Sequence, residues 1–285
     1  METTYSKDGF IFFRNKNSVD SIFDESLIIE PSKIKEAIAY INGKDLKSVM
    51  INSNYGKLTS LSFLEATPNL ESLKLLDEGL NIEAINNLKR LKELRIGKVN
   101  SKIDFTNFKM LQVLGATYNS SMDLSECKNL FWLWLDNFSE INLESISTLV
   151  NLEYLNFYNT SIIDLEGLES FINIKKIVIN SGKKLKSLAG LSKENGQLNA
   201  IDIYNAKKLI DYTSLINLSN IQYLRMVKTG DIANLDFIKD LVNLNTIILG
   251  LKVIDGNTKI LDGITSHQFK NYPHYNYKSP KFVMP

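Results

Sequence analysis

The sequence predicts an α/β solenoid, an elongated fold in which short repeated units stack along one axis. Ten segments carry the pattern Leu-x-x-Leu-x-Leu or a close variant, and a clear copy is Leu70-Glu-Ser-Leu73-Lys-Leu75. The step between copies is regular: those starting at 130, 152 and 174 follow one another at 22 residues, and those at 198, 221 and 244 at 23. One such unit cannot bury its own apolar edge, so the copies are stable only when they stack into a continuous core.

Residues 1–45 lie before the first copy and predict an N-terminal cap built from a strand plus a helix. Phe10–Arg14 is typical of a short strand, Pro31 predicts the start of a helix, and Gly43 predicts its end. The apolar residues of this segment recur at helical spacing, at Ile34, Ala37, Ile38 and Ile41. A separate functional domain is the alternative, but 45 residues are few for an independent core.

Residues 46–249 carry the ten repeats, which start at positions 46, 70, 91, 111, 130, 152, 174, 198, 221 and 244. In each repeat the first half predicts a short strand whose leucines point inward. The second half carries apolar residues about three positions apart, which predicts one or two turns of 3₁₀ or α-helix. One example of this second half is Ile141, Leu143, Ile146 and Leu149.

Residues 250–285 break the pattern and predict a C-terminal cap followed by an aromatic tail. The tail reads Tyr272-Pro-His-Tyr275-Asn-Tyr277. Because exposed aromatic side chains often anchor interfaces, a tail that contacts a partner is the alternative to a purely structural cap.

The copy that runs from Leu152 to Ile174 resembles the repeats of bacterial leucine-rich-repeat proteins of the internalin-like class, which are about 22 residues long. The resemblance covers residues 46–249. It implies a leucine-rich-repeat solenoid, with a curved parallel sheet on the concave side, short 3₁₀ or α turns on the convex side, and N- and C-terminal caps. It does not specify a function, because this fold serves many partners.

The chain departs from the family pattern just after the strand. The family usually places an inward-facing Asn or Cys there, whereas this chain has Thr160 and Thr229 at that position. Asn137, Asn159 and Asn205 come one position earlier.

The residues between the leucines alternate onto the outward, concave face of the sheet. We predict that a partner protein binds there, since exposed Trp and Tyr are enriched among interface hot spots and each buries roughly 150–250 Å². Interspersed charges would tune the complementarity of the surface. The predicted partner-binding residues are Trp132, Trp134, Asp136, Tyr154, Asn156, Tyr158, Asp202, Tyr204, Tyr223 and Arg225.

The earlier repeats place Lys74, Glu93 and Arg95 on the same face. An alternative interpretation of the whole row is that the aromatic rings pack on one another and merely shield the sheet. A glycan, on whose sugar rings aromatic side chains could stack, is a further alternative ligand. A small-molecule ligand is disfavoured, because an open sheet offers no closed concavity.

Several functional classes are disfavoured by composition. The 33 basic and 32 acidic residues give a net charge of +1, without the basic excess typical of a nucleic-acid-binding protein. The only histidines, His267 and His274, form no recognisable motif with the single Cys127, and no phosphate loop or nucleophile motif occurs. We therefore expect no enzymatic activity, no cofactor and no metal, with Cys127 buried in a repeat.

The N-terminal apolar run Phe10–Phe13 is too short for a signal peptide, and no stretch approaches the roughly 20 apolar residues of a membrane helix. The sequence thus predicts a cytoplasmic protein-binding solenoid without membrane contact. One specific hypothesis is an immunity protein that neutralises a bacterial toxin. The alternative is an exported internalin-like adhesin or effector that binds a host surface protein or glycan.

Overall fold

The computed structural model of the chain describes residues 2–15, 20–77, 79–98 and 103–269. The chain divides into two compact units. Unit 1 comprises Met1–Ser139 and Ile146–Leu155, and unit 2 comprises Glu140–Ser145 and Asn156–Pro285. The aromatic tail at 272–277 lies outside the described residues, and its contact with a partner stays a prediction.

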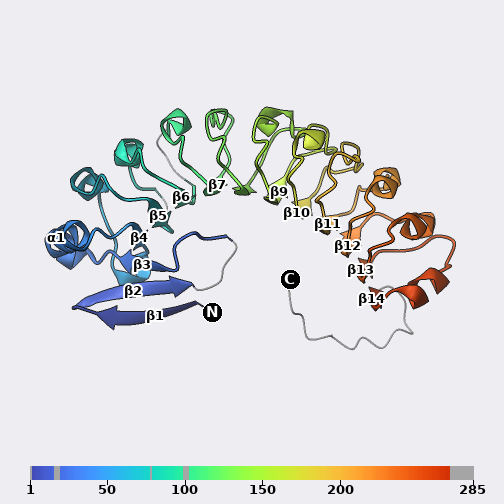
Figure 1. Cartoon of the computed structure of the whole chain (residues 1–285), viewed down its shortest axis with the longest axis horizontal. Coiled ribbons are helices and arrows are strands. Elements are labelled where there is room, and N and C mark those ends of the chain that lie inside the picture. Colours follow the sequence, from blue (N-terminus) through green and yellow to red (C-terminus); the bar gives the residue numbers. More distant parts are fainter. Residues whose placement is uncertain (1, 16–19, 78, 99–102, 270–285) are drawn as a thin grey trace. The chain divides into compact units, whose positions relative to one another are not determined.

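The strands follow one another in sequence order in a 14-stranded sheet (Figure 1). β1 pairs antiparallel with β2 and β2 with β3, whereas β3 with β4 and the later pairs of known register are parallel. The strands are β1 (Glu2–Lys7), β2 (Phe10–Asn15), β3 (Glu25–Ile28), β4 (Ser48–Ile51), β5 (Ser72–Leu75), β6 (Glu93–Ile96), β7 (Val113–Thr117), β8 (Trp132–Asp136), β9 (Tyr154–Thr160), β10 (Lys176–Gly182), β11 (Ala200–Ala206), β12 (Tyr223–Thr229), β13 (Thr246–Gly250) and β14 (Ser266–Phe269).

The leucine-rich-repeat solenoid is confirmed, because β4 to β13 each begin two residues after one of the ten predicted repeat starts. The parallel ladder also extends beyond the repeats, to β3 on one side and β14 on the other. The inward side chains of these strands, such as Leu73, Leu133 and Ile203, are completely buried. They form the core layer between the sheet and the return segments.

Most return segments contain a short 3₁₀ helix on the side of the repeat opposite its strand, whereas the described segments after β7 and after β10 have no helix (Figure 1). The helices are η2 (Ser53–Tyr55), η3 (Ser62–Ala66), η4 (Glu83–Asn87), η5 (Phe105–Asn107), η6 (Glu144–Ile146), η7 (Leu168–Ser170), η8 (Thr213–Asn217), η9 (Asp236–Asp240) and η10 (Lys259–Gly263). Leu143, Ile146 and Leu149 are buried as predicted. Ile141 is 63% exposed instead, and its backbone carbonyl oxygen accepts a hydrogen bond from the Ile163 amide of the next repeat at 2.7 Å.

The N-terminal segment contains two more strands than the sequence predicted, because β1 and β3 flank the expected strand β2. β1 and β2 form a hairpin that turns at Asp8 and Gly9, which both have positive φ. The helix begins as η1 (Pro31–Lys33) and continues as α1 (Ile34–Lys44), so Gly43 does not end it. Asp45 ends it with a left-handed backbone, a conformation that Asp tolerates better than most residues.

Each strand from β8 to β12 ends next to a residue with left-handed backbone, at Asn137, Asn159, Ser181, Asn205 and Lys228. This explains why the asparagines precede the position that the family pattern predicts. Asn visits this conformation at low cost and turns the chain, while the next residue, such as Thr160, points inward and is buried.

Ser181→Asn should raise the free energy of unfolding by on the order of 0.5 kcal/mol, because Asn tolerates φ of +62° better than Ser. The new amide oxygen can also accept the bond that Ser181 Oγ accepts from Asn205 Nδ2 at 3.3 Å. Thermal unfolding would show this as a small rise in Tm. The matched control is Ser161→Asn, at a residue without positive φ, which should leave Tm unchanged; an equal rise in both variants would contradict the explanation.

Candidate functional site

The two tryptophans lie on the outward face of unit 1, over a gap left by Gly115. In the strand register Gly115 lies beside Trp134, and Val113 lies beside Trp132. A Cβ atom on Gly115 would be 3.6 Å from the Trp134 ring and 3.8 Å from the Trp132 ring. The Arg95 guanidinium lies 5.2 Å from the centre of the Trp132 ring, within the range of a cation–π contact.

This packing makes the two tryptophans unequal. Trp132 is only 8% exposed, whereas Trp134 is half-buried. The expectation that both rings are accessible is therefore wrong for Trp132, which the strand alternation places outward but which packs sideways toward Arg95. Trp134 keeps an accessible edge, and Asp136 and Tyr154 of the same unit are half-buried.

Trp132→Ala should lower the free energy of unfolding by about 2 kcal/mol, below the range for a core Trp because the ring lies on the outward face of the sheet, packed against Arg95. Trp134→Ala should cost less than about 1 kcal/mol. Urea unfolding followed by circular dichroism separates the two, and the reverse order would contradict the packing described above.

The first part of the outward face in unit 1 is covered rather than exposed. Lys74 and Glu93 are buried although they point outward, because Ser21, which precedes β3, contacts both of them. Lys74 Nζ donates to Ser21 Oγ at 3.0 Å and to Ser26 Oγ at 3.2 Å. Arg95 forms an ion pair with Asp20 at 3.1 Å. These positions are thus unavailable to a partner.

Glu93 is the centre of this buried cluster. Its carboxylate accepts from Ser21 Oγ at 3.1 Å, from Ser72 Oγ at 3.3 Å and from Arg95 Nε at 3.2 Å. It also lies 3.5 Å from Lys74 Nζ. Burial lowers the pKa of Lys74, and the negative charge of Glu93 opposes that effect. The positive charges of Lys74 and Arg95 balance the negative charges of Glu93 and Asp20.

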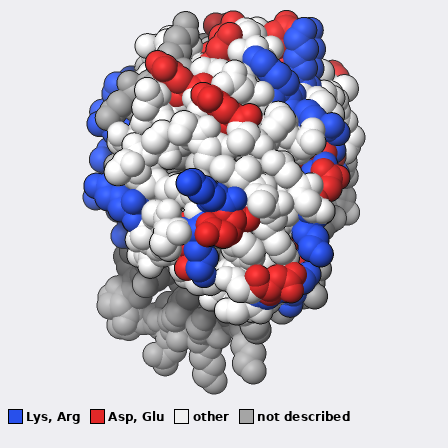
Figure 2. Space-filling view, turned by 90° about the vertical axis from the view of Figure 1, so that its left-hand side faces the viewer, with Lys and Arg blue, Asp and Glu red and all other residues white. Residues whose placement is uncertain are grey.

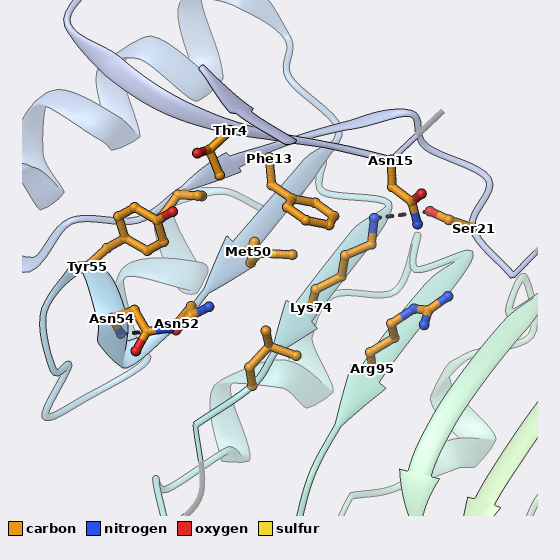
Figure 3. Close-up of a pocket in the computed structure, with 12 residues that line it drawn as sticks. Thr4, Phe13, Asn15, Ser21, Met50, Asn52, Asn54, Tyr55, Lys74 and Arg95 are labelled. Atoms are coloured by element: carbon orange, nitrogen blue, oxygen red, sulfur yellow. Dashed lines mark hydrogen bonds between the residues drawn. The ribbon is translucent and has the colours of Figure 1, made fainter. Parts of the chain in front are cut away.

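A pocket of about 330 Å³ opens beside this cluster, between the β1–β2 hairpin and the strands β4 and β5 (Figure 3). It is lined by Thr4, Phe13, Asn15, Ser21, Ile28, Met50, Asn52, Asn54, Tyr55, Lys74, Leu76 and Arg95. Sequence analysis missed this concavity, because nothing in the repeat pattern shows that the hairpin folds back over the sheet. Since the cations in its wall are already paired, its amides and rings suit an uncharged polar group.

The exterior of this N-terminal side carries no large surface of one charge. Figure 2 shows Lys and Arg side chains intermixed with Asp and Glu over this face. On β3 of this side, the hydrogen bond from Tyr5 and then the ion pair with Arg14 lower the pKa of the Glu25 carboxyl. Electrostatics therefore gives this face no preference for an anionic or a cationic partner.

In unit 2 the structure brings four predicted residues together on β11 and β12, and we name Asp202, Tyr204, Tyr223 and Arg225 the β11–β12 cluster. Arg225 Nη1 donates to both carboxylate oxygens of Asp202, each at 3.0 Å. The Arg225 guanidinium also lies 5.5 Å from the centre of the Tyr204 ring. Tyr223 stands in the next outward row, and burial raises the pKa of its phenol to about 12.

Lys228 completes this arrangement, although sequence analysis did not name it. Its ammonium lies 4.9 Å from the centre of the Tyr204 ring and donates to the Tyr204 hydroxyl at 2.6 Å. The Tyr204 ring is thus held by two cations, Arg225 and Lys228. The sequence signal that could have found Lys228 is its position in the repeat, which is the same as that of Asn159 and Asn205.

The remaining predicted residues of unit 2 do not extend this cluster into a continuous aromatic row. Tyr158 on β9 is 43% exposed and Asn156 is half-buried. Asn180 of β10 lies directly beside Tyr204, and Val178 lies beside Asp202, while β10 separates β9 from β11 in the sheet. The outward face is therefore a mixture of tyrosines, amides and charges.

Cys127 is buried, and this burial raises the pKa of its thiol to about 12. Throughout the described ranges, no group of three or more His, Cys, Asp or Glu side chains is arranged to hold a metal ion. Within the same part of the chain, no helix is long and apolar enough to cross a membrane.

Comparison with known proteins finds similar folds but no similar sequence. No protein-family model matches the chain, and no curated protein is detectably similar in sequence. Among solved structures, the internalin InlF from Listeria monocytogenes aligns with a TM-score of 0.59 and 19% identity, over 80% of this chain and 75% of that one. The functional domain of InlJ from the same organism aligns with a TM-score of 0.54 and 18% identity, over 71% of this chain and 43% of that one.

A yeast structure, the complex of Rad7 and Elc1, aligns with a TM-score of 0.52 and 15% identity, over 81% of this chain and 70% of the matched chain. These similarities show an internalin-like leucine-rich-repeat fold. InlJ is described as including a cysteine ladder, whereas this chain has a single cysteine.

Proposed function

We propose that this chain is a non-enzymatic binding protein that captures a partner protein on the outward face of its sheet, with the β11–β12 cluster as the central contact. The observation that carries the proposal is the Tyr204 ring, held by Arg225 and Lys228 while part of its surface stays accessible. A side chain that is fixed before binding loses little conformational entropy on association, and Tyr and Arg are frequent hot-spot residues.

The pairing within the cluster indicates what the partner presents. Asp202 already neutralises Arg225, so this guanidinium orients Tyr204 rather than offering a free charge. Lys228 is exposed at the rim of the cluster, where its charge is available to an acidic group of the partner. Tyr158 and Tyr204 supply the area that a partner's apolar or aromatic side chains would cover.

The structural neighbours support protein binding as a use of this fold. The Rad7 structure is a complex with the protein Elc1, so a solenoid of similar architecture forms a protein assembly. For this chain we propose the same kind of activity, without a cofactor.

A more specific proposal is that the partner is a bacterial toxin, which the chain neutralises in the cytoplasm as an immunity protein. The alternative is an exported adhesin or effector that binds a host surface protein or glycan, and the similarity to internalin folds favours this second candidate. Cells that express a toxin encoded beside this gene should survive only with the chain present if the first proposal holds. Recovery of the native chain from the culture medium would favour the second.

The binding surface is tested by affinity capture from native lysate with two matched variants. Tyr158→Ala combined with Tyr204→Ala removes the accessible tyrosines of unit 2. The control combines Ile172→Ala with Ile216→Ala, which truncates two exposed apolar residues of the return segments in the same unit. A partner that the wild type and the control retain, and that the tyrosine variant loses by at least about tenfold, would support the proposal.

Retention of that partner by the tyrosine variant would overturn the assignment of the site. Equal melting temperatures of the three proteins establish that folding is not the cause of any loss. Trp132 is left unchanged in this design, because its burial makes a loss of stability the expected result of its replacement.

A further inference from the structure

Four lysines occupy the tips of two neighbouring turns in unit 2, directly after the ends of β10 and β11. Gly182 O accepts from the Leu185 amide at 3.1 Å, so Lys183 and Lys184 are the central residues of a hydrogen-bonded turn. Ala206 O accepts from the Leu209 amide at 3.0 Å, which places Lys207 and Lys208 at the same positions of the next repeat.

The two turns lie side by side, because the chain is paired on both sides of them. Before the turns, Asn205 Nδ2 donates to Ser181 Oγ at 3.3 Å. After the turns, the Ile210 amide donates to Lys186 O at 3.1 Å. Lys183 is therefore a neighbour of Lys207, and Lys184 a neighbour of Lys208. With Lys186 these residues form what we name the lysine patch: Lys183, Lys184, Lys186, Lys207 and Lys208.

The lysine patch carries charge that the described residues do not neutralise. All five side chains are exposed, and none has a hydrogen bond or ion pair within the described ranges. The nearest carboxylate in sequence, Asp211, accepts instead from Ser187 Oγ and Thr213 Oγ1, each at 2.7 Å. Asp231 takes the place of Lys208 in the following repeat and so bounds the patch.

Three isoleucines lie in one row of neighbouring residues with Lys186 of the patch. Backbone hydrogen bonds link Ile163 to Ile141 at 2.7 Å, Lys186 to Ile163 at 2.8 Å and Ile210 to Lys186 at 3.1 Å, so these four residues are consecutive neighbours. Ile141 is 63% and Ile210 70% exposed. Ile210 is therefore a largely exposed apolar side chain that directly adjoins the lysine patch.

We propose that the lysine patch docks the protein onto an anionic lipid surface, with Ile210 as the apolar residue that enters the headgroup region. The combination of clustered lysines and an adjoining exposed aliphatic side chain is the composition that peripheral membrane surfaces use. This inference is independent of the proposed protein-binding function, since it uses other residues. It revises the sequence-based expectation of no membrane contact, which considered only net charge and spanning segments.

Other anionic partners fit these observations less well. The patch contains neither an arginine nor an aromatic residue, although nucleic-acid surfaces commonly combine basic residues with stacking platforms. A phosphate or carboxylate bound at one site would need converging donors, whereas these side chains project from turn tips. Hydrated, flexible ammonium groups suit a fluid layer of headgroups, which needs no fixed geometry.

The test is co-sedimentation of the full chain with vesicles of phosphatidylcholine alone, and with vesicles in which phosphatidylglycerol replaces a third of it. Binding is expected only to the anionic vesicles, and it should be lost at about 1 M salt, where the Debye length falls to about 3 Å. Each lysine near such a surface contributes about a fivefold gain in partitioning. Replacing Lys183, Lys184, Lys207 and Lys208 by Gln should thus weaken binding by at least about a hundredfold.

The matched control removes the same charge elsewhere, by replacing four exposed lysines of unit 1 with Gln: Lys35, Lys44, Lys57 and Lys128. It should bind the anionic vesicles as the wild type does. Ile210→Ser should weaken binding by about five- to tenfold while keeping the salt dependence. Circular dichroism melting of each variant shows that folding is unchanged.

Three outcomes would overturn the proposal: no binding of the wild type to anionic vesicles, equal loss of binding in the control, or full binding of the patch variant. A labelled single-stranded oligonucleotide is the remaining arm. If it binds the wild type, and the patch variant loses it while neither protein sediments with vesicles, the partner is nucleic acid and the lipid assignment is wrong.

Discussion

Replacing Gly190 by alanine should lower the free energy of unfolding by more than about 3 kcal/mol. Gly190 has φ of +102°, a conformation that side chains rarely adopt. A Cβ atom there would lie 1.9 Å from the carbonyl oxygen of Leu165 and 2.2 Å from its carbon, both in the backbone of the preceding repeat. The two repeats cannot separate to make room, because the Leu165 amide donates to Ala189 O at 2.7 Å.

Urea unfolding followed by circular dichroism measures this effect. Gly196→Ala is the matched control, since φ there is not positive and the nearest atom to an added Cβ is Lys193 O at 3.7 Å. Gly167, with φ of +96° and a Cβ approach of 2.8 Å to backbone atoms of Leu143 and Glu144, should fall between the two. A Gly190→Ala protein as stable as the Gly196→Ala control would show that the repeats adjust their spacing freely.

The period of the sequence was sufficient to predict the repeats, because burial of a stacked core leaves little choice for where each strand lies. Ten strand starts follow from the leucines alone, and the inward residues, such as Leu155 and Ile179, are all buried. The period does not predict how closely repeats approach, and the need for glycine at 190 appears only when two backbones are placed together.

The outward face was predicted less well, since alternation gives the direction of a side chain but not what covers it. Glu93 and Ser21 are 72 positions apart in sequence, and no local sequence pattern predicts a contact between such distant segments. Trp132 is buried for a related reason, because the absence of a side chain at Gly115 lets the ring lie sideways. The net charge of +1 likewise hides the lysine patch, which exists because two equal turns fall in adjacent repeats.

Glu93→Leu should lower the free energy of unfolding by about 3–5 kcal/mol, because it removes the carboxylate that lies 3.5 Å from the buried Lys74 ammonium and leaves only the weaker attraction of Asp20. The two serines that Lys74 contacts can accept hydrogen bonds, but they carry no charge. Arg95 also loses its contact with Glu93, but its ion pair with Asp20 at 3.1 Å remains. The measurement is urea unfolding of the variant against the wild type.

The double variant Glu93→Leu with Lys74→Met should recover most of this loss, and end within about 1–2 kcal/mol of the wild type. A buried ion pair costs desolvation of both charges, so replacing both members by apolar side chains of similar size removes that cost together with the attraction. The double-mutant cycle should therefore give a coupling energy of about 2 kcal/mol or more. If the two losses simply add, the Glu93 carboxylate and the Lys74 ammonium do not compensate each other. Other contacts, such as the cation–π contact of Lys74 Nζ with the Phe13 ring at 6.0 Å from its centre, then hold the N-terminal segment on the sheet.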